Sequence, residues 1–91
     1  MKISREILES LDFKPHKDGR DLYLLDVTEW IGTQYGNQAC ELQVDLELEM
    51  ITLMVYCTDK PENDNVCEYL WLNNIQTDAE LILIISLLRG K

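Results

Sequence analysis

The residues best spaced to do chemistry are four carboxylates on one predicted strand: Glu41, Asp45, Glu47 and Glu49. Same-face residues on a strand lie about 6.6–6.8 Å apart, too far for neighbouring carboxylates to share one small cation without further ligands. Paired carboxylates can hydrolyse glycosides at similar separations, but they need a cleft and one raised pKa. A solvated strand provides neither. We therefore expect a solvated face or a surface for a basic partner, and we assign no catalytic residue, metal ligand or cofactor.

A sharper interpretation of these carboxylates is that they imitate the phosphates of a nucleic acid. Residues 21–59 hold eight Asp or Glu and no Lys or Arg. The whole chain has 17 acidic and 8 basic residues, for a net charge of −9. Such a surface repels a phosphate backbone and attracts basic proteins. Direct nucleic-acid binding is therefore not expected, and solubility alone would also explain the charge.

The three cysteines, Cys40, Cys57 and Cys67, form no metal or disulfide motif. They include no C-x-x-C pair, and the single histidine, His16, is distant in sequence. Structural zinc sites normally take four Cys or His ligands in close pairs, and secreted disulfide frameworks more often show four or six cysteines. We expect three reduced packing residues, because free cysteine behaves as a small hydrophobic residue. We expect His16 to lie at the surface.

Aromatic side chains provide two further candidates, both for binding. Residues 30–37 combine Trp30 and Tyr35 with two glycines, and aromatics on such a loop often serve recognition. The alternative is that Trp30 and Tyr35 close one end of the core. Tyr69 and Trp71 alternate on another predicted strand. If the even positions of the 66–72 strand point inward, this pair forms an exposed patch of the kind that marks protein interfaces.

The predicted strand that carries the carboxylates has the clearest alternation in the chain. Its apolar residues occupy even positions at first and odd positions later: Leu42, Val44, Leu46, Leu48, then Ile51, Leu53, Val55, Cys57. One strand over 41–57 would exceed the usual length of about 3–10 residues. We therefore predict a tight reversal or a bulge near Leu48–Ile51, although Asn-Gly and Asp-Gly are absent there. The acidic positions would then cover the open face of the sheet.

Helices are predicted at both ends of the chain. Ser4 can cap a short N-terminal helix. Thr77 and Glu80 form a capping box for a C-terminal helix that Gly90 ends. Residues 81–88 are apolar almost all round, so this helix must be covered on more than one side, by the core or by another subunit.

The element order is helix, three or four antiparallel strands, helix. Strands over 22–27 and 66–72 complete it, and residues 28–38 fit either a strand or an ordered loop. This order predicts one two-layer α+β domain over 1–91, with a three- to four-stranded meander and the C-terminal helix packed on one sheet face. The N-terminus lacks the apolar segment of a signal peptide, and no run reaches membrane-spanning length, so we expect a cytoplasmic protein.

Both ends of the chain resemble a known group of small proteins. The quoted motifs are Ile7-Leu8-Glu9-Ser10-Leu11-Asp12-Phe13-Lys14, Ile75-Gln76-Thr77-Asp78-Ala79-Glu80-Leu81 and the ending Leu88-Arg89-Gly90-Lys91. They are similar to uncharacterised proteins encoded in prophages and mobile elements of gut Bacteroidetes. The common members have Gly where Asp12 stands, and residues 28–39 look like an insertion. The group has no established activity, so the resemblance assigns no functional residue.

The sequence favours a non-catalytic protein-interaction or accessory module that binds a partner or forms a homodimer. The candidate interaction residues are Trp30, Tyr35, Glu41, Asp45, Glu47, Glu49, Tyr69 and Trp71. The alternatives are an acidic inhibitor that mimics nucleic acid and a small ligand-binding protein that uses residues 30–37. An exposed aromatic patch favours the first function, a flat acidic sheet the second, and a deep pocket with His16 or a cysteine the third.

Overall fold

A computed structural model describes residues 2–17, 21–31, 36–60 and 65–90. The elements are α1 (Arg5–Ser10), β1 (Lys14–Pro15), β2 (Leu22–Asp26), α2 (Thr28–Ile31), β3 (Gln38–Asp45), β4 (Met50–Cys57), β5 (Val66–Trp71) and α3 (Asp78–Leu88). The strands form one antiparallel sheet in the order β1-β2-β3-β4-β5, a simple meander. The stretch that fitted either a strand or a loop begins with α2 and ends in β3.

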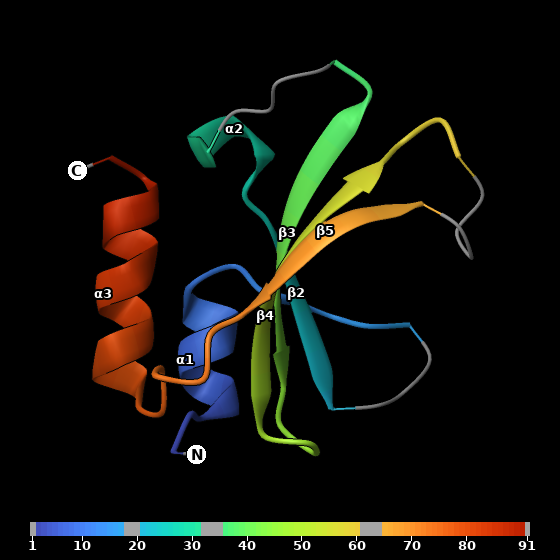
Figure 1. The fold of residues 1–91 in the computed structure, drawn as a ribbon. Helices are drawn as coiled ribbons and strands as arrows, with labels where there is room; N and C mark the ends of the chain where they lie inside the picture. Colours follow the sequence, from blue (N-terminus) through green and yellow to red (C-terminus); the bar gives the residue numbers. More distant parts are fainter. Residues whose placement is uncertain (1, 18–20, 32–35, 61–64, 91) are drawn as a thin grey trace.

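The sheet and the terminal helices form two layers (Figure 1). α1 and α3 lie on the same side of the sheet, and the core takes side chains from both helices and from β2, β3 and β4. Its fully buried members are Leu8, Val27, Leu42, Val44, Ile51, Leu81 and Ile85. The predicted two-layer α+β fold is confirmed. The sheet has five strands rather than three or four, because the two-residue β1 adds an edge beside β2.

The N-terminal segment is attached to the start of α3. The Ser4 hydroxyl caps α1 by accepting a hydrogen bond from the Ile7 N–H at 3.2 Å. The Ser4 N–H and hydroxyl both donate to the Asp78 carboxylate, at 2.9 and 3.1 Å. The Lys2 N–H donates to the Gln76 carbonyl at 2.6 Å. The first and last helices are therefore joined at their N-terminal ends.

The C-terminal end of α1 is set by a left-handed residue. Asp12 has φ of 71°. Its N–H donates to the Glu9 carbonyl at 3.1 Å, and the Phe13 N–H donates to the Leu8 carbonyl at 3.0 Å. These two bonds make the Schellman motif, which normally brings together the side chains that flank it. Phe13 and Leu8 are accordingly both buried in the core.

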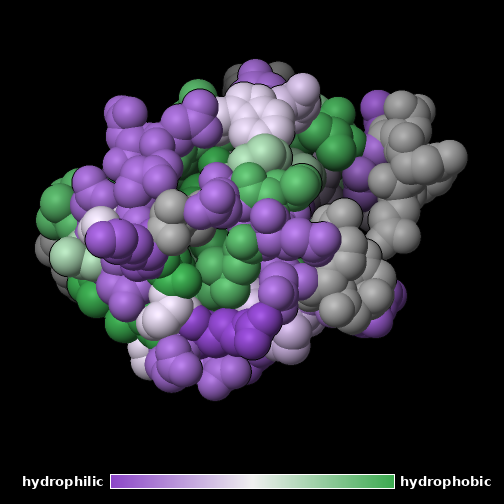
Figure 2. Space-filling view, turned by 90° about the horizontal axis from the view of Figure 1, so that it is seen from below, coloured by the Kyte–Doolittle hydropathy of each residue, from purple (hydrophilic) through white to green (hydrophobic). Residues whose placement is uncertain are grey.

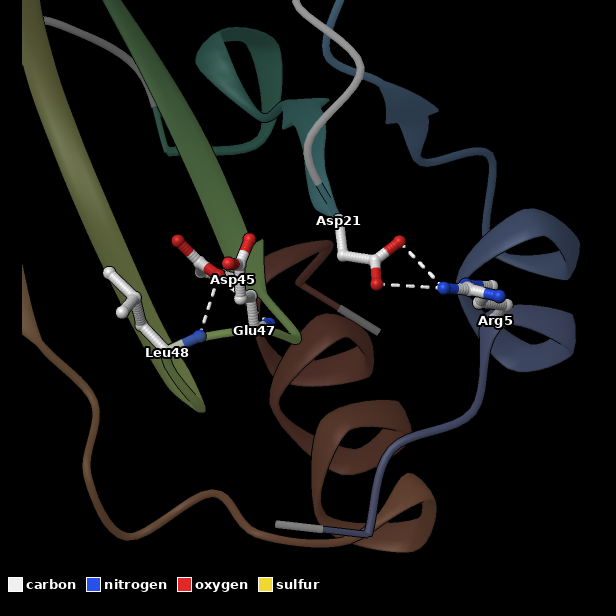
Figure 3. A network of polar contacts seen from close by, with 5 residues as sticks. All are labelled: Arg5, Asp21, Asp45, Glu47 and Leu48. Carbon is white, nitrogen blue, oxygen red and sulfur yellow. Dashed lines mark hydrogen bonds and ion pairs between the residues drawn. The ribbon is translucent and has the colours of Figure 1, made fainter.

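Polar contacts anchor both ends of β2. Before the strand, both Asp21 carboxylate oxygens accept hydrogen bonds from the Arg5 guanidinium at 2.7 Å (Figure 3). After it, the Asp26 carboxylate accepts from the N–H and hydroxyl of Thr28 at 2.9 and 2.6 Å, where α2 begins. The Thr28 hydroxyl also accepts from the Cys40 N–H at 3.0 Å, which holds α2 against β3.

A four-residue turn joins β3 to β4. One Asp45 carboxylate oxygen accepts hydrogen bonds from the N–H groups of Glu47 and Leu48 at 3.0 and 2.9 Å (Figure 3). Glu49 has φ of 55°. The Asp45 side chain and the left-handed Glu49 thus form the tight reversal that Asn-Gly or Asp-Gly usually forms in a hairpin. The placement of Leu46 and Leu48 on a buried strand face is therefore wrong: both lie in the turn, and Leu48 is exposed.

The strand register separates the two faces of the sheet. The pairs Val44–Ile51 and Leu42–Leu53 face the helices, and the intervening positions face away from them. The open face carries Leu22, Leu24, Asp26, Ala39, Glu41, Gln43, Asp45, Met50, Thr52, Met54, Tyr56, Val66, Tyr69 and Trp71. Of the four carboxylates expected on this face, Glu41 and Asp45 lie on it, whereas Glu47 and Glu49 lie in the turn beyond the end of β3, and most of the neighbouring strands' residues on this face are apolar.

Helix α3 begins with the predicted capping box. The Glu80 N–H donates to the Thr77 hydroxyl at 3.2 Å, and Glu80 reaches back toward the preceding turn. Its core-facing side chains are Leu81 and Ile85, and its exposed large apolar ones are Ile82, Leu83 and Leu87. The chain alone thus covers one side of α3. None of the helices in the described ranges is both long and apolar enough to cross a membrane.

Candidate interaction surface

The open face of the sheet contains an apolar hollow. Its volume is about 370 Å³, which lies at the lower end of the ~300–1,000 Å³ typical of ligand pockets. It is lined by Leu22, Gln43, Asp45, Leu48, Met50, Thr52, Met54, Val66, Tyr69 and Trp71. Figure 2, seen from below, shows hydrophobic surface recessed between hydrophilic side chains, and more of it on the side where α3 lies. The hollow can accept one or two apolar side chains.

Tyr69 and Trp71 form the most exposed aromatic feature of this face. Their rings meet edge to face, with centroids 5.7 Å apart and an interplanar angle of 86°. The two side chains are 57% and 47% exposed. They belong to β5, an edge strand in which all six residues are exposed. Leu70, between them, pairs with Leu53 on the other face and is also exposed. The aromatic pair therefore projects from the open face into solvent.

A second hollow adjoins the first. It has a volume of about 340 Å³ and shares Leu22, Gln43, Met54 and Val66 with its neighbour. Its other lining residues are His16, Leu24, Glu41, Tyr56 and Asn65. His16 is half-buried here rather than at the surface as expected. Burial, and then the nearby Glu41 carboxylate, raises the pKa of Tyr56 above its ordinary value. This end of the face is more polar than the aromatic end.

The structure does not bring the four carboxylates into one row. Glu41 lies on the open face and accepts a hydrogen bond from the Gln43 amide at 2.9 Å. Asp45 is 9% exposed, and its carboxylate holds the turn. Glu47 and Glu49 lie in the turn and are exposed. Across the described parts of the chain, no cluster of three or more His, Cys, Asp or Glu could hold a metal ion.

Trp30 belongs to the core end of the molecule rather than to the open face. It is half-buried on α2 and packs against the core. The Arg89 guanidinium carbon lies 4.7 Å from its ring centroid, a cation–π distance. This geometry matches the interpretation in which Trp30 closes one end of the core. Tyr35, the other aromatic of the 30–37 segment, lies outside the described residues.

The cysteines differ from the expectation of three packing residues. Cys40 is 2% exposed, and burial raises the pKa of its thiol. Cys67 is exposed, so it is not a packing residue. Its sulfur lies 2.7 Å from the Cys57 sulfur on the neighbouring strand. Sequence reasoning missed this pair, although the two residues stand at the end of one predicted strand and the start of the next.

Comparison of the chain with protein-family models, with curated proteins and with solved structures found no match. The function has to be inferred from the chemistry of the surface itself.

Proposed function

We propose that this protein is a non-catalytic interaction module, working in the cytoplasm, whose open sheet face binds an apolar, positively charged segment of a partner protein. The observation that supports this most is the exposed Tyr69–Trp71 pair beside an apolar hollow. Neither α1 nor α3 covers this face of the sheet (Figure 1). Tyr and Trp are the residues most enriched at the energetic centres of protein interfaces.

The aromatic pair offers enough area to contribute usefully to binding. Each ring exposes about half of the ~150–250 Å² that such a side chain can bury, so covering both removes on the order of 200 Å² from water. At ~25 cal/mol per Å² this gives about 5 kcal/mol before the entropic losses of association. Met50 and Met54 beside the pair are flexible and adapt to apolar side chains of different shape.

Charge indicates the chemistry of the partner. The segment 21–59, which supplies most of the hollow, has eight carboxylates and no Lys or Arg. Glu41 and Asp45 lie on the open face itself. A partner segment with Lys or Arg beside its apolar residues is attracted to this field, whereas a second copy of the chain carries −9 and is repelled. The partner is therefore a basic protein rather than another copy.

The other two interpretations have less support. Nucleic-acid mimicry requires a row of charges, and Glu47 and Glu49 leave the sheet face at the turn. A ligand site at residues 30–37 requires a hollow there, and the described residues of that segment line neither hollow of the open face.

Selection of random peptides against the immobilised protein tests the proposal. We expect enriched peptides to combine aromatic or branched apolar residues with Lys or Arg. Trp71→Ser should weaken their binding at least tenfold, which is about 1.4 kcal/mol. The matched control is Leu83→Ser, which removes an exposed apolar side chain from α3 and should leave affinity unchanged. Affinity should also fall as salt is raised.

Three results would contradict the proposal. Peptides without cations, or peptides that bind Trp71→Ser as well as the wild type, would show that another surface is recognised. A stable dimer in light scattering that Trp71→Ser dissociates would show that this face binds a second copy. In that case the charge argument against self-association is wrong.

A further inference from the structure

Cys57 and Cys67 are held together by the register of β4 and β5. Tyr56 pairs with Val66, Val55 pairs with Glu68, and Cys67 lies in the irregularity between these pairs. The N–H of Cys57 donates to the Asn65 carbonyl at 2.6 Å and fixes the strand end. The two sulfur atoms are 2.7 Å apart and both thiols are free. A disulfide bond of about 2.05 Å therefore needs a movement of less than about 1 Å.

The two thiols have different surroundings. Cys57 is 8% exposed, whereas Cys67 is exposed to solvent. Its hydrogen bond to Cys67, and then burial, raise the pKa of the Cys57 thiol, although the positive charge of Lys60 acts in the opposite direction. A small disulfide in solution therefore reaches the Cys67 sulfur first. This exposure makes Cys67 the attacking group and the buried Cys57 the resolving group.

We propose that Cys57 and Cys67 form a reversible dithiol–disulfide site that small-molecule disulfides such as oxidised glutathione oxidise. The Cys67 thiolate attacks one sulfur of the small disulfide, breaks its S–S bond and releases one thiolate, which takes a proton from water. Cys57 then loses its proton to water and attacks the Cys67 sulfur, which breaks the mixed disulfide bond and releases the second small thiolate, and this thiolate also takes a proton from water. The protein pair gives up two electrons and two protons, and the small disulfide accepts them. This inference does not depend on the proposed function.

Equilibration in glutathione buffers of graded redox ratio tests the site. The free thiols are trapped by alkylation, and the linked peptides are mapped by mass spectrometry. We expect one internal disulfide between Cys57 and Cys67, with Cys40 remaining a thiol. The bond closes a short loop, so the melting temperature of the oxidised wild type should rise by about 10 °C. The matched control Cys40→Ser should show the same oxidation.

Two single variants separate the roles of the thiols. Cys57→Ser should accumulate a stable glutathione adduct on Cys67, because the resolving thiol is missing. Cys67→Ser should react slowly, because its remaining thiol at this site is buried. Three results in the wild type would overturn the proposal, whether or not the variants fold. These are a linkage to Cys40, a glutathione adduct that never resolves, or a pair that stays reduced in the most oxidising buffer.

Discussion

Replacing Asp12 by Gly is expected to stabilise the protein. At φ of 71°, an L-residue loses about 1–2 kcal/mol relative to glycine, and Asp loses somewhat less because its short side chain tolerates this region. A carboxylate near a helix C-terminus is unfavourable by a further ~0.3–1 kcal/mol. Glycine lowers the stability by about 0.5–1 kcal/mol, because the unfolded chain has more conformational freedom to lose at that position. The net gain is about 0.5–1 kcal/mol, or about 2–8 °C in melting temperature.

Two further substitutions at the same position separate conformation from charge. Asp12→Asn removes the charge and keeps a side chain that tolerates the left-handed region, so it should stabilise slightly. Asp12→Ala removes the charge but not the conformational strain, and it should be less stable than Gly by about 1 kcal/mol. Urea unfolding at low and high salt measures both contributions. The difference in free energy of unfolding between the Asn variant and the wild type should shrink as salt is raised, because it comes from charge. The difference between the Gly and Asn variants should not change with salt, because it comes from backbone conformation.

Equal stability of the Gly and Ala variants would refute this reasoning. It would mean that residue 12 is not held in the left-handed region. The Schellman bonds from Asp12 and Phe13 would then not form as described, and another contact would have to direct Phe13 into the core.

The remaining predictions concern a turn, a helix cap and a helix end. Asp45→Ala should lower the free energy of unfolding in urea by about 1–3 kcal/mol, because two turn N–H groups lose their acceptor. Asp45→Asn should lower it by less, because the amide oxygen can still accept these hydrogen bonds. The pKa of Glu80 is lowered first by the Gln76 N–H and then by the Thr77 hydroxyl. The charged Glu80 carboxylate therefore stabilises the folded protein at pH values above its unfolded pKa of about 4.3, and this contribution is lost as the pH falls through the lower folded pKa. The difference in urea midpoint between wild type and Glu80→Gln should thus be present at neutral pH and vanish in acid; a pH-independent difference would contradict this. Arg89→Gln should remove about 0.5–1 kcal/mol by ending the contact with Trp30, and a Trp30→Leu background should abolish the effect.

The helices could be predicted because their signals are local. Ser4 and Thr77 cap the next three residues whatever the rest of the chain does, and Gly90 has the left-handed φ of 77° expected after a helix. Strands β2 to β5 could be predicted for the same reason, since apolar and alternating runs need only neighbouring residues, whereas the two-residue β1 was expected to be part of a loop.

The open face could not be predicted because it depends on where one strand stops. The alternation of apolar and polar residues continues unbroken to Glu49, but the Asp45 side chain turns the chain four residues earlier. The apolar lining of the hollow comes from strands that are apolar on both faces, such as β4, where alternation carries no information about direction. The Cys57–Cys67 contact depends on a register shift that no sequence pattern revealed.

The bonds from Ser4 to Asp78 have a consequence for how the protein is made. They join residues 74 positions apart, so a growing chain cannot form them until Asp78 has left the ribosome. Helix α1 has six residues, too few to persist alone. Helix α1 is thus synthesised before the sheet, but it becomes ordered only after the start of α3 is available. Until α3 is complete, the helix-facing side of the sheet remains uncovered, and an interrupted chain presents that apolar layer to chaperones and proteases.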